Sequence, residues 1–150
     1  IAIGTDIIVG FCGETEAEFV DTLSAYQACD FDISYHAQYS TRSGTLATKV
    51  YKDDIVKEEK KRRWDVLQAL MEETTYRKNQ KYLNQTVSVL VDGWDKGWCN
   101  GNSKEMKRVR FKGDASLVGK IQNVGVFKAE MWMLWGRLYT THDSDNTTQS

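Results

Sequence analysis

The sequence predicts two structural classes in one chain, an α/β segment followed by an all-β segment. Short apolar runs flank one helical pattern near the start, which is typical of a βαβ unit. Later the pattern changes to alternating apolar and polar residues between closely spaced glycines, which is typical of a small barrel. We therefore expect an α/β part at residues 1–52, a linking helix at 53–84, an antiparallel five-stranded, OB-like barrel at 85–139 and a disordered tail at 140–150.

The α/β part begins with a strand at residues 6–10 (DIIVG), an unbroken apolar run that suits burial on both faces. Thr15 and Glu18 have the spacing of a capping box, so we expect a helix to start there. Residues 31–39 (FDISYHAQY) return to a strand pattern. Two parallel strands and one helix cannot cover their own apolar faces. We therefore expect this part to be the end of a larger α/β domain that begins upstream.

The linking helix is expected at about residues 56–81. We expect its front, KEEKKRR, to be solvated, and an apolar face that includes Trp64 and Leu67 to pack on the rest of that larger domain. Five short strands follow, among them TVSVLVDG, KRVRF, GKIQNVGVFKAE and MWMLWGRLY. Trp132 and Trp135, in the last of these, are expected in the core of the barrel.

Charge is distributed unevenly along the chain. Residues 1–41 hold seven acidic residues and no Lys or Arg, whereas residues 42–139 hold all 20 basic residues against 12 acidic ones. The basic part is therefore a candidate for contact with a polyanion. Cys12, Cys29 and Cys99 have no metal-ligand spacing, so free thiols in a cytoplasmic protein are expected, with neither a metal site nor a catalytic group. No segment has the length and hydropathy of a membrane span.

Two stretches resemble a known family. Residues 5–19, TDIIVGFCGETEAEF, resemble the TDIIVGFPGET segment of the radical SAM methylthiotransferases, and residues 39–47, YSTRSGTLA, resemble their YSxRxGTxA segment. NSKEMKRVRF, LVGKIQNVGVFKAE and MLWGRL resemble the C-terminal TRAM domain of the same family. The chain departs from the family in having no proline, including at Cys12 and Val56, where the family has it.

The resemblance implies that the first part is the last βαβ portion of a radical SAM partial TIM barrel and that the small barrel is a TRAM domain. It also implies SAM and two [4Fe–4S] clusters in the full-length enzyme. The CxxxCxxC motif that holds the SAM-binding cluster does not occur in this chain. We therefore expect the fragment to be inactive alone, with tRNA and the missing N-terminal part of the enzyme as its partners.

The same resemblance places the loop with Gly10, Gly13 and Glu14 beside the SAM pocket, with Tyr39 and Arg42 on the same side. Tyr39 either stacks on a base or closes the barrel. Arg42 either holds a carboxylate or phosphate, or forms a salt bridge to the acidic first segment. RNA-binding barrels combine cations with aromatic rings. The RNA contacts that we predict in this barrel are Trp94, Lys96, Trp98, Lys104, Lys107, Arg108, Arg110, Lys112 and Lys120.

The arginine in the second motif is more like the tRNA-modifying branch, so we expect a methylthio group to be added to isopentenylated adenosine next to the anticodon. Three alternatives stay open. They are the branch that acts on threonylcarbamoyl-adenosine in tRNA, the branch that modifies a ribosomal protein, and a stand-alone RNA-binding module without catalysis.

Overall fold

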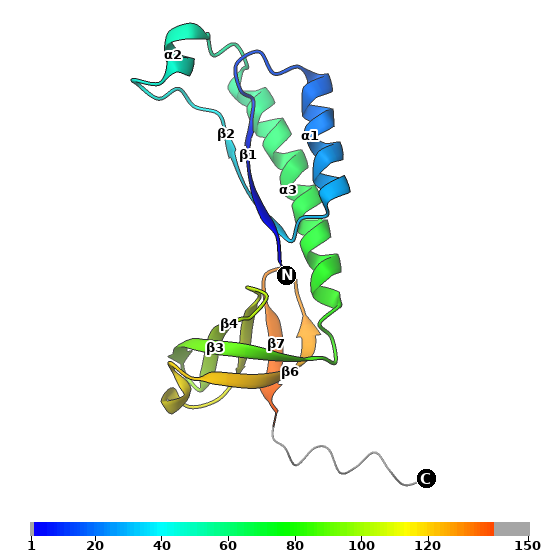
Figure 1. The fold of residues 1–150 in the computed structure, drawn as a ribbon, viewed down its shortest axis with the longest axis vertical. Helices are drawn as coiled ribbons and strands as arrows, with labels where there is room; N and C mark the ends of the chain where they lie inside the picture. Colours follow the sequence, from blue (N-terminus) through cyan, green and yellow to red (C-terminus); the bar gives the residue numbers. More distant parts are fainter. Residues whose placement is uncertain (1, 140–150) are drawn as a thin grey trace. The chain divides into compact units, whose positions relative to one another are not determined.

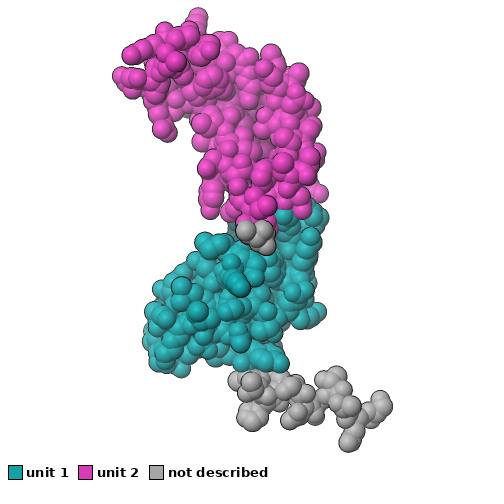
Figure 2. Space-filling view, in the orientation of Figure 1, with its two compact units in different colours: residues 1, 75–150 teal, residues 2–74 magenta. Residues whose placement is uncertain are grey.

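The computed structural model describes residues 2–139. Its contacts divide the chain between Thr74 and Thr75 into two compact units (Figure 2). In chain order, the first unit is residues 2–74, drawn in magenta, and the second unit is the part that follows, drawn in teal. No helix in the described residues is both long and apolar enough to cross a membrane. The boundaries that we predicted at 52/53 and 84/85 remain predictions.

The first unit is a βαβ unit followed by two further helices (Figure 1). Strands β1 and β2 pair in parallel, in register from Gly4↔Ile33 to Val9↔Gln38. The elements of this unit are β1 (Gly4–Val9), α1 (Glu16–Cys29), β2 (Ile33–Gln38), α2 (Leu46–Val50) and the first part of α3 (Lys57–Gln80).

Helix α1 begins and ends at residues with specific cap geometry. The Thr15 hydroxyl accepts a hydrogen bond from the Glu18 amide, and the Glu18 carboxylate accepts one from the Thr15 amide at 2.7 Å. This reciprocal pair confirms the predicted capping box. The helix ends at Asp30, whose left-handed conformation (φ 49°) stops the helical hydrogen-bond series.

The core of the first unit lies between the β1–β2 pair and helices α1 and α3, which cover one face of the pair (Figure 1). Its buried apolar residues are Val9, Phe19, Tyr26, Leu67 and Met71. Leu67 and the adjoining Trp64 therefore pack within this unit, and the expectation that they await a missing domain is wrong. The opposite face of the sheet is different, because Ile8 and Tyr35 are largely exposed there.

The second unit contains a closed five-stranded barrel with strand order β3-β4-β5-β7-β6. All neighbouring strands are antiparallel except β5 and β7, which are parallel. The predicted five strands and OB-like barrel are compatible with this arrangement, whereas the prediction of a wholly antiparallel barrel is wrong. The strands are β3 (Thr86–Asp95), β4 (Trp98–Ser103), β5 (Arg108–Lys112), β6 (Ile121–Ala129) and β7 (Leu134–Leu138), with a 3₁₀ turn at Ala115–Leu117 before β6.

The last turns of α3 belong to the barrel unit. Asn79 is buried, and its side-chain amide donates hydrogen bonds to the carbonyls of Glu130 and Met131 at 2.9 and 2.8 Å. Gln80 donates in the same way to the carbonyl of Ala129 at 3.0 Å. These bonds satisfy three backbone acceptors at the β6–β7 connection, which would otherwise need water.

Candidate functional site

The carboxyl ends of β1 and β2 carry the two loops that the sequence motifs predicted. Gly10 and Gly13 have φ angles of 71° and 78°, a region that L side chains rarely adopt. At Gly10 a side chain would also clash, because a Cβ atom would lie 2.4 Å from Lys60 Cγ. The loop therefore packs its bare backbone directly against helix α3.

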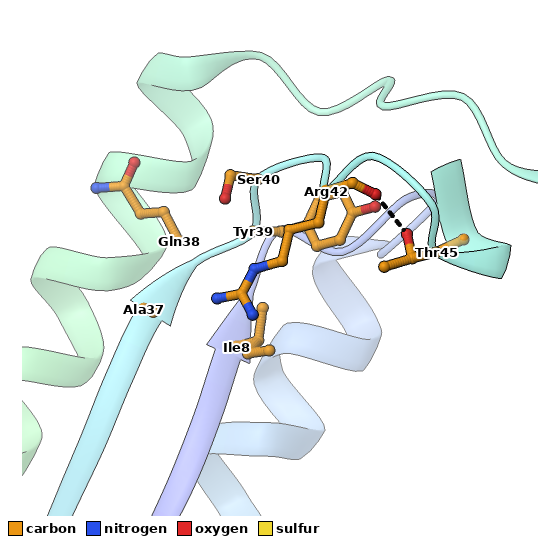
Figure 3. Close-up of a pocket in the computed structure, with 8 residues that line it drawn as sticks. Ile8, Ala37, Gln38, Tyr39, Ser40, Arg42 and Thr45 are labelled. Atoms are coloured by element: carbon orange, nitrogen blue, oxygen red, sulfur yellow. Dashed lines mark hydrogen bonds between the residues drawn. The ribbon is translucent and has the colours of Figure 1, made fainter. Parts of the chain in front are cut away.

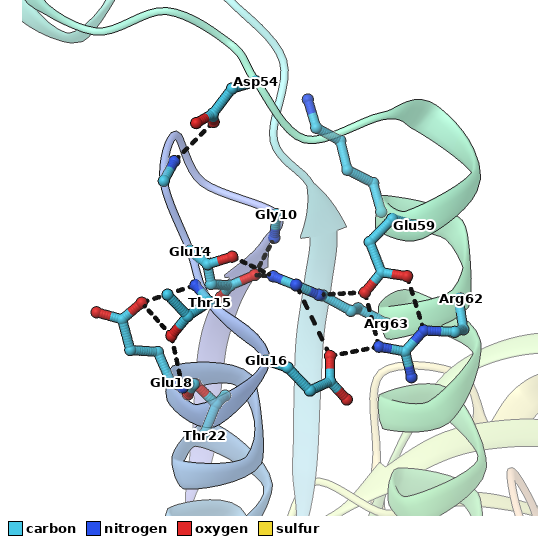
Figure 4. A network of polar contacts seen from close by, with 12 residues as sticks. Gly10, Glu14, Thr15, Glu16, Glu18, Thr22, Asp54, Glu59, Arg62 and Arg63 are labelled. Carbon is cyan, nitrogen blue, oxygen red and sulfur yellow. Dashed lines mark hydrogen bonds and ion pairs between the residues drawn. The ribbon is translucent and has the colours of Figure 1, made fainter.

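The loop is held by a nearly buried arginine (Figure 4). Arg63 Nη1 donates to Glu14 Oε2 at 2.5 Å and to the Glu14 carbonyl at 2.9 Å, and its side chain is only 5% exposed. The same Glu14 carboxylate accepts a hydrogen bond from the Gly10 amide at 2.6 Å. Arg63 Nε also donates to Glu59 at 2.8 Å. Glu14 also borders a cavity with Phe11 and Gly13. Its carboxylate is not free to bind a ligand there, because it already accepts hydrogen bonds from Arg63 and from the Gly10 amide.

Lys60, one turn before the arginine, is buried as well. Its ammonium group lies 2.6 and 2.7 Å from the two Asp53 carboxylate oxygens and donates to the Tyr39 carbonyl at 3.2 Å. The expectation that KEEKKRR forms a solvated helix face is thus wrong for two of its residues. Their charges are turned inward because acceptors lie on that side, in the loops after β1 and β2 and in the segment between α2 and α3.

This charge network makes the first unit sensitive to acid. Hydrogen bonds from Arg62 and, to a smaller extent, from Arg63 lower the pKa of Glu59 from 4.5 to about 2. A carboxyl whose pKa is lower in the folded than in the unfolded state stabilises the fold above the unfolded pKa and loses that contribution as the pH falls through the folded pKa. We expect amide protection in β1 and α1 to fall between about pH 4.5 and pH 2. Hydrogen exchange across this range measures it, and Glu59→Gln should show a shallower fall; an equal fall would contradict this assignment.

The second motif forms one wall of an open cavity of about 220 Å³ at the end of β2 (Figure 3). The Arg42 side chain extends toward Ile8, and its carbonyl accepts a hydrogen bond from the Thr45 hydroxyl at 2.9 Å. Within residues 2–139 no carboxylate pairs with Arg42, so the alternative of a salt bridge to the acidic first segment is wrong. Tyr39 also lines the cavity, and its ring meets the Phe11 ring edge-on with 4.9 Å between the two ring centroids.

The barrel carries a second group of site residues on the outer face of β5. Strand alternation points Val109 and Phe111 into the core, so Arg108, Arg110 and Lys112 share the outer face. Lys107 precedes the strand and is buried, so it does not belong to the basic residues that this face exposes.

Arg110 is flanked by two tryptophans. Its guanidinium carbon lies 5.5 Å from the Trp98 ring centroid and 5.6 Å from that of Trp135, and the two rings meet edge-on at 5.4 Å. Trp135 Nε1 donates to Glu130 at 2.8 Å, which fixes the second ring. The guanidinium is thus held in one place without a carboxylate partner among the described residues. Such a cation can bind an external anion with little loss of side-chain entropy.

Several known proteins similar to this chain carry the same name. The tRNA-2-methylthio-N(6)-dimethylallyladenosine synthase of Geobacillus thermodenitrificans is 41% identical over 141 residues, which is 92% of this chain and 27% of the relative. The enzyme of the same name from Bacillus subtilis is 39% identical over 140 residues, 27% of its length. The chain is a homologue of these synthases. It spans little more than a quarter of their length. No protein-family model matches it.

In this synthase homologue the other predicted RNA contacts are scattered. Lys96, Lys104 and Lys120 are exposed on separate connections between strands. Arg108 is paired with Asp92. Trp94 is exposed, and its indole nitrogen donates to the Gly113 carbonyl at 2.9 Å. The structure therefore brings together Trp98, Arg110 and Lys112 and leaves the others apart.

Trp135 and Arg137 of the same face were missed, and Trp132 was wrongly expected in the core. Trp135 is half-buried on the outer face beside Arg110 rather than in the core, and Trp132 is 50% exposed. Arg137 lies with its guanidinium 5.1 Å from the Phe127 ring centroid. The alternation Leu134-Trp135-Gly136-Arg137 contained the signal for the outer positions in β7, because Leu134 and Gly136 are both buried. The same alternation marks Phe127 as an outer position of β6, because Val124 and Val126 are both buried.

Proposed function

We propose that this chain is the C-terminal part of a tRNA methylthiotransferase that adds a methylthio group to isopentenylated adenosine near the anticodon. The names of the relatives support this choice over the threonylcarbamoyl-adenosine and ribosomal-protein branches. The chain's own share of the task is to bind tRNA through the barrel and to contribute one wall of the pocket in which the adenosine reacts. A cytoplasmic location follows from a tRNA substrate.

The observation that carries the RNA-binding role is the outer face of β4, β5 and β7. It presents three cations next to aromatic rings, Arg110 and Lys112 beside Trp98 and Arg137 beside Phe127, and none of them has an ion-pair partner within residues 2–139. In OB-type barrels the face of the second and third strands binds oligonucleotides. Strands β4 and β5 are the second and third of this barrel, which supports its assignment as a TRAM domain.

The βαβ unit fits the end of a radical SAM barrel. In a barrel of parallel strands the active site lies at their carboxyl ends, and the helices cover the outside. Here the two motif loops lie at those ends, both helices lie on one face, and Ile8 and Tyr35 are left exposed on the other. We propose that the upstream part of the enzyme covers that face and supplies the remaining strands.

The residues present fit one side of a SAM or substrate pocket and no cluster site. The cavity at Tyr39 and Arg42 measures about 220 Å³, below the roughly 300 Å³ at which small-ligand pockets begin, so further walls must come from elsewhere. Arg42 would bind a carboxylate or phosphate there, and the glycine loop would position Glu14 and the helix behind it. SAM, when bound, supplies the radical chemistry. Among residues 2–139 no three His, Cys, Asp or Glu side chains gather as metal ligands.

Titration of the chain with an unmodified tRNA tests the proposal. Three unpaired cations and one or two exposed lysines predict a log–log salt slope of about −3, because each phosphate contact with single-stranded RNA contributes about −0.7. Filter binding between 50 and 300 mM KCl measures this slope. Weak binding that does not change with salt would instead favour the branch that acts on a ribosomal protein.

A further inference from the structure

A cavity of about 360 Å³ opens on the outer surface of the barrel. It is bordered by Trp98 and Lys112, which are partners across β4 and β5, and by Phe127 of β6. Between them lies the backbone of Gly136 in β7. A Cβ atom there would point inward and meet Val124 Cγ1 at 2.2 Å, so only main chain faces outward at this position. The cavity therefore has a flat backbone floor between aromatic walls.

The aromatic wall on the β6 side follows from strand alternation, which turns Phe127 outward because Val124 and Val126 face the core. The pairing of β6 with β7 shifts register between Val126 and Lys128, and Phe127 lies at that shift. A shift of this kind re-aims a side chain, and here it keeps Lys128 outward as well before Ala129 returns to the core. Phe127 is 49% exposed, so its ring is available to a ligand.

Cations lie at the edge of the cavity, and acidic residues do not line it. Lys112 Nζ is 5.8 Å from the Trp98 ring centroid, and the Arg137 guanidinium is 5.1 Å from that of Phe127. Neither has a carboxylate partner in the described part of the chain. The cavity thus combines two ring surfaces with two cations, which is the combination that a flat base attached to a phosphate requires.

We propose that this cavity receives one unpaired nucleotide of the bound RNA, with its base against Phe127 and Trp98 and its phosphate at Lys112 and Arg137. The inference rests on the proposed RNA-binding function and names what the site takes. Paired bases in an A-form helix are stacked out of reach, so only a loop or single-stranded nucleotide can enter. The lining side chains offer rings and cations rather than amides or carboxylates, so the site adds affinity with little choice between bases.

Fluorescence anisotropy with a labelled RNA hairpin that has a seven-nucleotide loop tests this. The probes are the intact hairpin and versions in which each loop nucleotide in turn is abasic. A stacked base contributes about 1–3 kcal/mol, so Phe127→Ala should weaken binding of the intact hairpin between about 5-fold and 140-fold. It should have little further effect on the one abasic hairpin that has lost the base in the cavity. Tyr76→Ala, which removes an exposed ring on α3, is the matched control and should change the affinity less than twofold.

The outcomes separate this proposal from the function on which it rests. If Phe127→Ala weakens all hairpins equally, or none, while Arg110→Gln still weakens them, then the barrel binds RNA and the cavity proposal is wrong. If no hairpin binds to the unaltered chain, the RNA-binding function itself fails. Adenosine monophosphate that binds alone as tightly as the hairpin would show a free-nucleotide site and would also overturn the proposal. Unchanged thermal melting of Phe127→Ala checks that the barrel is folded.

Discussion

Replacing Arg63 with alanine is expected to lower the free energy of unfolding of residues 2–74 by about 2–3 kcal/mol. Its side chain is 5% exposed and donates to Glu14 and Glu59. Removing one member of a buried pair leaves the partner charge without compensation, at a cost of about 3–5 kcal/mol. We expect less than that here because Glu59 keeps some contact with water.

Arg62 provides a matched control within the same helix. It also contacts Glu59 and Glu16, but its side chain is 46% exposed. Exposed pairs contribute about 0–1 kcal/mol, so Arg62→Ala should have a small effect. Hydrogen exchange of amides in β1 and α1 reports on this unit separately from the barrel. Equal losses in the two variants would show that burial of Arg63 does not decide its contribution.

A triple variant, Arg110→Gln, Lys112→Gln and Arg137→Gln, is expected to reduce the salt slope of tRNA binding by about 2. Each lost phosphate contact removes about 0.7 from the slope. Extrapolated from equal binding at 1 M salt, a change of 2 in the slope corresponds to roughly a hundredfold weaker binding at 0.1 M. Filter binding between 50 and 300 mM KCl measures both quantities.

The control for this variant changes the net charge by the same amount elsewhere on the barrel. Lys96, Lys104 and Lys120 are exposed on separate connections, and replacing all three with glutamine should change the slope by about 0.7–1.4, because only one or two of them are expected to contact phosphate. If the two triple variants weaken binding equally, then overall charge attracts the RNA and the face with Arg110 has no special role.

Much of the fold could be predicted because its signals are local. The capping box at Thr15 and Glu18 fixes the start of α1, and alternation marks β3. Strand β4 was missed, because WCNGNS has small and polar residues where a strand pattern has branched ones. The parallel pairing of β5 and β7 was also missed, since closure of a barrel depends on residues far apart in the sequence.

The sites were harder to predict, because burial of a charge depends on its distant partners. Nothing in KEEKKRR distinguishes Lys60 and Arg63 from their exposed neighbours until Asp53 and Glu14 are placed beside them. On the barrel, alternation alone would have put Arg108, Arg110 and Lys112 on one face. The register shift after Val126, in contrast, is not revealed by the sequence, and it turns Lys128 outward directly after Phe127.

The hydrogen bonds from Asn79 and Gln80 decide where the barrel can be excised for separate expression. A shortened gene that starts at the first barrel strand would remove both amide donors. The carbonyls of Ala129, Glu130 and Met131 would then lose their side-chain hydrogen bonds. A cut at Thr75 keeps these donors and the last turns of the helix that carries them. The shorter product should be the one that precipitates on purification.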